Sequence, residues 1–580
     1  MPRRLLARYL RRYAPWYLGG FAFLALASVC SLAIPWMVKN AIETLEAGRE
    51  AGELGWYVAA IFVLAAAHGV VRLGSRFAIY GAGQRIEHDI RSDLYGHLQT
   101  LPPAFFQAQR TGDLMSRASN DLSAVRHLVG FGALSLMGTT LAFAGTLIAM
   151  LAIDPWLTLY TMVPFPLLIL LAKRFNALIH LRSQAVQDQL GRLSAKVQEN
   201  LAGAAVVRAY TMEAREVAEF GRLNRELLGR SLALARTQAG FSPLMGVISG
   251  LGMLILLWLG GKAVVDGRIS LGAFVAFNGY LAHLVWPTLA LGWTLTALRR
   301  GLSAMGRIGE VLAVEPEISD TEGASELLAP APGLSVEFRN LTFSYPGRRP
   351  ALREVSLTVP AGSLVAIVGP TGSGKSTLGL LIPRLFDPPA GAVLVDGRDV
   401  RSIRLRALRM AVGHVPQESF LFSRSLRENL ALAREEVGEA EIRGAGERAG
   451  LAEEVEGFPQ GWETVVGERG LTLSGGQRQR AALARALLRQ PRILILDDVF
   501  SSVDALKEGE ILGALRGVLK GCTVLLITHR LRAAQLADWI VVLEEGRIAA
   551  RGTHAELLAR SPLYARLWQV QQLEEELSRA

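Results

Sequence analysis

The stretch GPTGSGKS, residues 369–376, decides how the second half of this chain folds. It ends the apolar run SLVAIVG, whose β-branched and aliphatic residues are typical of a strand buried on both faces. The apolar stretch TLGLLIPRL, residues 377–385, follows directly and is expected to form a helix. A glycine-rich loop between a buried strand and a helix lets backbone amides surround phosphate groups. The sequence therefore predicts a nucleoside triphosphate site at this loop.

Two side chains of this loop have a predicted chemical role. Lys375 is expected to reach the β- and γ-phosphates, and the Ser376 hydroxyl is expected to ligate Mg²⁺. A short motif of this kind also arises by chance, but the strand–loop–helix context argues against chance here. The other loop residues expected to contact the nucleotide are Gly369, Pro370, Thr371, Gly372, Ser373, Gly374 and Thr377.

A second buried strand is predicted in RILILDDVF, residues 492–500, and it ends at Asp497 and Asp498. An acidic residue at the carboxyl end of a parallel strand beside a phosphate loop is placed to hold Mg²⁺, directly or through water, and Asp497 fills that position. The plain alternative is an acid in the turn after a strand.

The segment LTLSGGQRQRAALARAL, residues 471–487, lies between these two motifs and predicts an amphipathic, Arg-rich helix. Ser474, Gly475 and Gly476 precede it, and small residues at a helix start offer bare amides to an anion. Taken alone, SGGQ also fits a flexible loop.

The first half of the chain has a different composition. Of the 580 residues, 51% are hydrophobic and only 20% are charged, which indicates membrane spans. The long apolar runs stop near Leu298. Six stretches are long and apolar enough to cross a membrane: residues 16–38, 54–80, 128–153, 156–172, 241–264 and 271–295.

The charges between these spans set an orientation. Arg-rich segments at the N-terminus, at 81–127 and at 173–240 alternate with short, less basic connections. The positive-inside rule then places both termini in the cytoplasm. The net charge of +10 belongs to these segments, so we expect no nucleic-acid partner. The two long segments show helical periodicity and are expected to leave the membrane as helices, with turns near 111–115 and 211–214 that contact a cytoplasmic domain.

With these motifs in order, the second half of the chain resembles an ATP-binding cassette, and the whole chain resembles the half-transporters of the ABC exporter superfamily. The resemblance implies that GPTGSGKS is the Walker A motif, ILILD the Walker B motif, and LSGGQ, which ends at Gln477, the signature. The implied fold is a membrane α-helical domain of six spans with long cytoplasmic extensions, fused to an α/β P-loop cassette. The implied boundaries are a transmembrane domain at 1–312, a linker at 313–333 and the cassette at 334–580.

The resemblance also assigns roles to residues outside these motifs. Tyr345 in FSYPG would stack on adenine, Gln417 in HVPQESFLF would sense Mg²⁺, and His529 in LLITHR would touch the γ-phosphate. Asp504 in SSVDA matches the loop that crosses the dimer interface, and GERG at 467–470 resembles a segment that couples the cassette to the helical turns. Singly, each has a plain alternative, such as a surface tyrosine or a satisfied core histidine.

One position departs from the family pattern. The residue after the Walker B aspartate is normally a glutamate that polarises the attacking water, whereas this chain has Asp498. A reacting group displaced by about 1 Å can lower a rate on the order of 100-fold, so Asp498 predicts weak hydrolysis with ATP binding kept. The chain thereby resembles the degenerate-site subunit of bacterial heterodimeric multidrug or peptide exporters, which implies a second, different half-transporter that carries the glutamate.

The expected activity is ATP hydrolysis coupled to transport, with ATP and Mg²⁺ as cofactors, in the bacterial inner membrane. Alternating access would move amphipathic drugs, peptides or lipids out of the cytoplasm. A homodimeric lipid flippase and an ATP-gated channel or regulator remain alternatives. The spans show no obvious buried charge. Six residues of the last two spans either line a cavity or pack between helices, and none is assigned to substrate: Ser242, Trp258, Asn278, Tyr280, His283 and Trp286.

Overall fold

The structure is a computed structural model that describes residues 2–48, 51–326, 333–434, 436–467, 470, 472–500, 508–513 and 521–579. Three residues with an expected role, Glu468, Arg469 and Asp504, lie outside the described residues. The chain divides into two compact units. One comprises Met1–Thr100 with Gln109–Glu315, and the other comprises Leu101–Ala108 with Pro316–Ala580.

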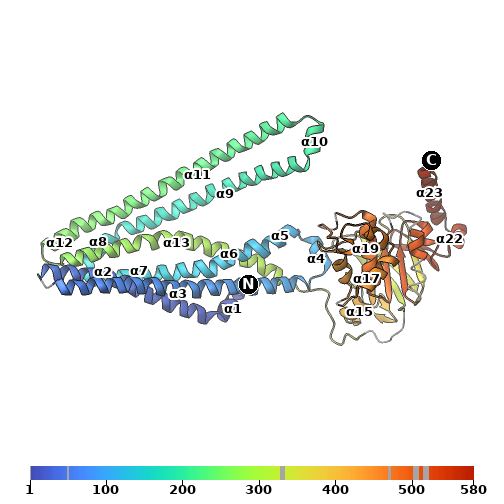
Figure 1. Cartoon of the computed structure of the whole chain (residues 1–580), viewed down its shortest axis with the longest axis horizontal. Helices are drawn as coiled ribbons and strands as arrows, with labels where there is room; N and C mark the ends of the chain where they lie inside the picture. The colour runs from blue at the N-terminus through green and yellow to red at the C-terminus, as the bar shows by residue number, and fades with distance from the viewer. Residues whose placement is uncertain are drawn as a thin grey trace. The chain divides into compact units, whose positions relative to one another are not determined.

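The first unit is helical throughout its described residues (Figure 1). Three of its segments, η1–η3, are short π-helical turns inside longer helices. The elements are α1 (Pro2–Arg12), α2 (Ala14–Glu46), α3 (Ala51–Leu98), α5 (Thr111–Ser116), η1 (Arg117–Asp121), α6 (Leu122–His127), η2 (Leu128–Gly132), α7 (Ala133–Ile153), α8 (Pro155–Met162), α9 (Pro164–Ala202), α10 (Ala204–Ala209), α11 (Glu213–Ile255), η3 (Leu256–Gly260), α12 (Gly261–Val265) and α13 (Leu271–Leu312).

Six helical stretches among the described residues are long and apolar enough to cross a membrane, and each contains one of the six predicted spans. Helices are the form expected there, because hydrocarbon offers no partner to a backbone amide or carbonyl. Large apolar side chains such as Phe62 (75% exposed) and Trp258 (76% exposed) lie on the outer faces of these helices, as contact with lipid requires. The prediction of a six-span helical domain is confirmed.

The second long basic segment forms a helical hairpin. Helices α9 and α11 run side by side, and α10 joins them at the tip (Figure 1). Lys196 Nζ lies 2.6 Å from Glu216 Oε2, and Arg182 Nη1 donates to the carbonyl of Ala233 at 2.6 Å, so polar contacts hold the two helices together. Thr211 adopts φ +52° just before α11 begins, which puts a turn within the predicted region.

The first turn lies earlier than the predicted 111–115. Residues 111–116 already form helix α5, and Asp113 forms an ion pair at 2.9 Å with Arg117 one helical turn later. The reversal is at residues 99–110 and contains the short helix α4 (Pro103–Ala108). Consecutive prolines at 102 and 103 explain the position, because proline cannot continue the hydrogen bonding of α3. Residues 101–108 belong to the second compact unit, where Ala104 packs against a core cluster of that unit.

The second unit contains two sheets. Six strands pair in the order β10-β9-β3-β8-β7-β6, with parallel pairing from β9 through β6, and four strands pair in the antiparallel order β2-β1-β4-β5. The strands are β1 (Val336–Ser344), β2 (Pro350–Val359), β3 (Leu364–Val368), β4 (Val393–Val395), β5 (Arg398–Asp399), β6 (Val412–Val415), β7 (Ile493–Asp497), β8 (Thr523–Ile527), β9 (Trp539–Glu544) and β10 (Arg547–Gly552).

Helices pack against these sheets and form two large hydrophobic clusters with them. One cluster includes α14 with β3, and the other includes α16, α17 and α19. The helices are α14 (Lys375–Leu381), η4 (Val400–Ser402), α15 (Leu405–Ala411), α16 (Leu426–Ala431), α17 (Glu439–Arg448), α18 (Ala452–Glu456), η5 (Gly461–Glu463), α19 (Gly475–Leu488), α21 (Leu531–Ala534), α22 (His554–Arg560) and α23 (Pro562–Arg579). The predicted α/β cassette architecture is confirmed.

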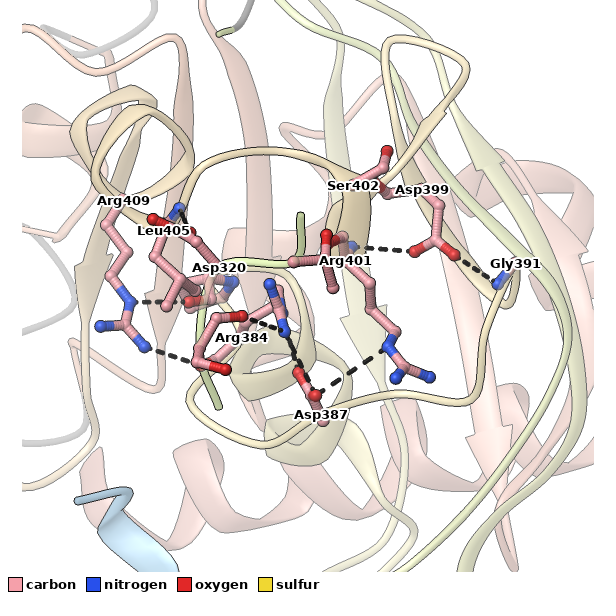
Figure 2. A network of polar contacts seen from close by, with 12 residues as sticks. Asp320, Arg384, Asp387, Gly391, Asp399, Arg401, Ser402, Leu405 and Arg409 are labelled. Carbon is pink, nitrogen blue, oxygen red and sulfur yellow. Dashed lines mark hydrogen bonds and ion pairs between the residues drawn. The ribbon is translucent and has the colours of Figure 1, made fainter. Parts of the chain in front are cut away.

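A polar network ties the segment before β1 to the body of the cassette (Figure 2). Asp320 accepts a hydrogen bond from the backbone amide of Leu405 at 2.7 Å. Nearby, the fully buried Arg384 donates to Asp387 at 2.7 Å, and Arg409 donates to the carbonyl of Arg384 at 2.9 Å. The Asp387 carboxylate and the Ser319 carbonyl compensate the burial of the Arg384 guanidinium through Nε and Nη2, whereas its Nη1 has no hydrogen-bond partner among the described residues.

Candidate active site

The phosphate loop connects the end of β3 to α14, and its glycines are sterically required. Gly369 has φ +148°, and a Cβ there would lie 2.0 Å from the carbonyl oxygen of Leu543. Gly374 has φ +98°, and its Cβ would lie 2.5 Å from the carbonyl oxygen of Ala351. Gly372 has φ +80° but open space around it. The loop therefore packs tightly at two points and is open between them.

Lys375 lies at the centre of this loop. Its side chain is buried, and Nζ donates hydrogen bonds to the carbonyls of Gly369 and Pro370, both at 2.8 Å. Burial lowers the pKa of Lys375, and the nearby Asp498 and Asp497 oppose that shift. The loop also holds a buried hydroxyl, Ser373 Oγ, that has no hydrogen-bond partner. An ammonium group and an unsatisfied hydroxyl in one glycine-rich loop fit the oxygens of a triphosphate.

The acidic end of β7 lies against the same loop. Ser376 Oγ donates to Asp497 Oδ1 at 2.9 Å, and burial raises the pKa of Asp497. The next residue, Asp498, has φ +49° and accepts a hydrogen bond at 3.3 Å from the Gln417 side chain. Hydroxyl, amide and carboxylate oxygens are the ligands that Mg²⁺ prefers. Printed contacts thus join Ser376 to Asp497, and Gln417 to the neighbouring Asp498. That Ser376, Gln417 and Asp497 hold Mg²⁺ stays a prediction.

His529 follows β8, the strand between β3 and β7. Partial burial of its imidazole lowers its pKa, the positive charge of Lys375 lowers it further, and Asp498 opposes both. This environment favours the neutral imidazole, which has one N–H donor and one acceptor nitrogen.

Tyr345 lies one residue beyond β1. Its hydroxyl lies 3.2 Å from Thr377 Oγ1 at the start of α14, and its ring makes edge-to-face contacts with Phe343 and Phe386 at centroid distances of 5.2 and 5.0 Å. The contact with Thr377 places the ring beside the phosphate loop. The expectation that it stacks on adenine stays a prediction.

The signature segment forms the start of α19. Ser474 caps α19: it accepts a hydrogen bond from the amide of Gln477 at 3.2 Å, and the Gln477 side chain accepts one from the Ser474 amide at 2.9 Å. Ser474 is exposed and Gly476 is buried. Among the described residues, no hydrogen bond joins 474–477 to 369–377.

A buried ion pair near Asp498 was not foreseen. Glu508 Oε2 lies 2.8 Å from Arg530 Nη1. Arg530 directly follows His529, the residue expected to touch the γ-phosphate. Burial raises the pKa of Glu508, and Arg530 opposes the shift. In the sequence, the position of Arg530 next to His529 was the one indication of this ion pair. Glu508 gave no indication, because it follows a segment without strong periodicity.

Comparison with known proteins gives a consistent result for both halves. Residues 17–288 match the family described as ABC transporter transmembrane region, and residues 352–501 match the family described as ABC transporter. The chain is 34% identical, over 97% of its own length and 97% of the relative, to a probable multidrug resistance ABC transporter ATP-binding/permease protein of Bacillus subtilis.

Two further comparisons cover almost the full chain. It is 35% identical, over 99% of its length and 95% of the relative, to an ATP-dependent lipid A-core flippase of Syntrophus aciditrophicus. The solved structure of a bacterial Atm1-family ABC exporter with ATP bound superimposes with a TM-score of 0.80 at 28% identity, covering 97% of this chain and 99% of that one.

Proposed function

We propose a role for this chain from one premise, that it belongs to the ABC exporter superfamily. It is a multi-pass membrane protein, its cassette binds ATP, and its ATPase activity drives transport. Its proposed role is that of one subunit of an exporter that moves amphipathic drugs, peptides or lipids out of the cytoplasm. The proposed location is the bacterial inner membrane, with both termini in the cytoplasm. The Arg-rich α1, with Arg11 and Arg12 in its last turn, supports this orientation.

The residues around Asp498 support a more specific proposal, that this chain hydrolyses ATP slowly. Gln417 contacts its carboxylate, and Ser376 and Asp497 pair beside it, so the position adjoins the proposed Mg²⁺ ligands. The family uses glutamate there, and aspartate is one methylene shorter. We infer that Asp498 holds the attacking water poorly. The site around Lys375 would then bind ATP, with Asp497 and Ser376 on Mg²⁺ and His529 near the γ-phosphate, and hydrolyse it slowly.

The position of the signature supports a composite site. Residues 474–477 have no hydrogen bond to the phosphate loop of their own chain among the described residues, and exporters of this family act as dimers. We infer that Ser474 and its neighbours face the ATP held by a second cassette. If that cassette carries glutamate after its Walker B aspartate, the composite site hydrolyses ATP efficiently. A heterodimer with a different half-transporter satisfies both conditions.

The coupling path follows from the turns. Residues 101–108 belong to the compact unit of the cassette, and Ala104 contacts its core, which supports a role of α4 in passing cassette motion to the helices. We infer that the tip at 204–212, whose Tyr210 is 73% exposed, docks on the cassette of the partner. Closing of the cassettes around ATP and their separation after hydrolysis would then alternate the accessible side of the membrane.

The test is ATP turnover by the full chain purified without any second gene product. The heterodimer proposal expects slow turnover, a near-normal affinity for ATP, and acceleration when a half-transporter with the glutamate is added. Brisk turnover by this chain alone that Asp498→Asn abolishes would sink the proposal, because the chain would then be a competent homodimer. A homodimeric lipid flippase is the second candidate, favoured by the identity to the lipid A-core flippase. Movement of labelled lipid between leaflets would identify it.

A further inference from the structure

The helical unit contains a cavity of about 680 Å³. Its lining comes from α2, α3, η2, α7 and α13, which all overlap predicted spans. Of the residues considered from the sequence, His283 and Trp286 line this cavity, whereas Tyr280 is buried and donates a hydrogen bond to the carbonyl of Leu32. The lining also includes Arg72 and Arg76 of the second span. The expectation that the spans show no obvious buried charge overlooked these two side chains.

These residues form a stripe on α3. His68, Arg72, Arg76 and Tyr80 are spaced four residues apart, and all four line the cavity. His68 Nδ1 lies 2.8 Å from the carbonyl oxygen of Ala27, near the middle of the first predicted span, which fixes the depth of the stripe. A rise of about 1.5 Å per residue puts Arg72 about 6 Å and Arg76 about 12 Å along the helix from His68. Half the hydrocarbon thickness of a bilayer is about 15 Å, so the backbone positions of both arginines lie within the hydrocarbon layer.

No acid among the described residues pairs with this charge. The six predicted spans contain no Asp and no Glu. Among the ion pairs of the described part of the chain, none involves Arg72 or Arg76. A second copy of this chain would bring the same spans and therefore no carboxylate at this depth. Unpaired guanidinium groups within a membrane are costly, and they are found where an anion or water-filled path meets them.

Aromatic side chains also line the cavity. Trp286 and Trp293 on α13 are partly exposed, and their rings contact edge to face with centroids 5.7 Å apart. Phe131, near the start of α7, also lines the cavity. Rings of this kind offer a large apolar surface to a ligand. The cavity thus offers two arginines from α3 and aromatic rings from α13 and η2, with His283 and several hydroxyl groups also in the lining.

We propose that this cavity is a substrate site for amphiphiles with an anionic head group, a phosphate or a carboxylate. Arg72 and Arg76 hold the head group, because the guanidinium fork matches both anions with paired hydrogen bonds. The apolar part of the ligand lies against Trp286 and Trp293. This inference rests on the proposed export function and names the substrate class of that function.

The experiment uses the full-length chain, with any co-purified partner subunit, in nanodiscs of phosphatidylcholine. The probes are two lysolipids with the same fluorescently labelled acyl chain, lysophosphatidylglycerol (anionic) and lysophosphatidylcholine (zwitterionic). We expect the anionic probe to bind at least about tenfold more tightly, as charge-assisted hydrogen bonds predict. The Arg72→Gln/Arg76→Gln double variant should lose this preference, and the Arg72→Lys/Arg76→Lys variant should keep most of it.

A matched control is Arg85→Gln. Arg85 lies on the same helix, but its guanidinium lies 3.9 Å from the Trp16 ring centroid, outside the cavity lining. It should leave both affinities unchanged. Adding phosphatidylglycerol to the discs separates two sources of the ligand: competition with the probe identifies a bilayer lipid, and no competition identifies a free amphiphile. Either result supports the site.

Equal affinities of the two probes, or a preference that survives the Gln substitutions, would overturn the inference. Equal affinities would mean that water or a partner's carboxylate already satisfies the two arginines, and a surviving preference would mean that other groups select the anion. Basal ATP turnover in the same discs separates this failure from that of the proposed function. Charge-selective binding without any ATP-dependent transport would instead refute the export proposal and leave the site in place.

Discussion

The side-chain amide of Gln417 donates a hydrogen bond at 3.3 Å to Oδ2 of Asp498. Gln417 follows β6 and Asp498 follows β7, so the contact joins the ends of two neighbouring parallel strands. The backbone amide of Asp498 also donates to the carbonyl of Ile527 at 2.8 Å, which fixes its position against β8. The carboxylate is therefore held in place, and its reach is set by the length of its side chain.

Lengthening that side chain should restore hydrolysis. Asp498→Glu adds one methylene, and we expect ATP turnover to rise about 10- to 100-fold, because the carboxylate then reaches the position that the family uses. Asp498 has φ +49°, a backbone region in which Asp is more frequent than Glu, so a small loss of thermal stability should accompany the gain. Steady-state phosphate release measures the rate, and nucleotide titration checks that ATP affinity is kept. An unchanged or lower rate at equal affinity would contradict the assignment of Asp498 as the impaired base.

The Ser376–Asp497 pair should control the Mg²⁺ dependence of ATP binding. Ser376→Ala removes a metal ligand and also the donor to the buried Asp497 carboxylate. We expect ATP affinity in Mg²⁺ to fall at least about tenfold, as for the loss of a hydrogen bond to a charged group, and affinity in EDTA to stay within about twofold. Ser376→Thr keeps the hydroxyl and is the matched control. Equal losses with and without Mg²⁺ would mean that the serine supports the loop and not the metal.

Two glycines of the phosphate loop should respond differently to the same substitution. Gly369→Ala would place a methyl group 2.0 Å from the carbonyl oxygen of Leu543, so the loop must move. Gly372→Ala meets no atom within 4 Å and costs only the strain of φ +80°, about 1 kcal/mol. We expect Gly369→Ala to abolish measurable ATP binding and to lower the melting temperature. Gly372→Ala should weaken ATP binding less and lower the melting temperature less. Comparable effects of both would show that backbone strain, and not the contact with Leu543, limits this loop.

Much of this architecture was predictable because it depends on local patterns. The six spans were found from apolar length alone, and β3 and β7 were found from uninterrupted runs of β-branched and aliphatic residues. The pairing of Ser376 with Asp497 also followed, because the ends of parallel strands meet at one edge of a sheet.

Other features depend on tertiary contacts that no local pattern encodes. The first turn was misplaced because the helical pattern at 111–116 was interpreted as a break, whereas the prolines at 102 and 103 mark the true reversal. The basic stripe was missed because His68, Arg72 and Arg76 stand singly among apolar residues. Their spacing of four becomes meaningful only when the facing helices are known to leave a cavity.

A buried histidine should make the stability of the cassette depend on pH. His414 is on β6, and its Nε2 atom is buried without a hydrogen-bond partner. It lines a cavity of about 340 Å³ together with Arg485 and Arg489. Burial lowers the pKa of His414 from 6.5 to about 4. The unfolded chain therefore takes up the proton first as the pH falls, and the folded state loses stability between pH 6.5 and pH 4.

The size of this effect follows from the shift. At pH 5 the unfolded histidine is mostly protonated and the folded one is not, so the free energy of unfolding should be about 2 kcal/mol lower than at pH 7 through this group alone. His414→Phe removes the titration and should flatten the profile by that amount. Thermal unfolding of the full chain in detergent at pH 7 and pH 5 measures the difference, and His88→Gln, exposed on α3, is the control. His414→Phe removes one group that takes up a proton on unfolding. If the stability of this variant falls as steeply with pH as that of the parent, the acid sensitivity comes from other groups.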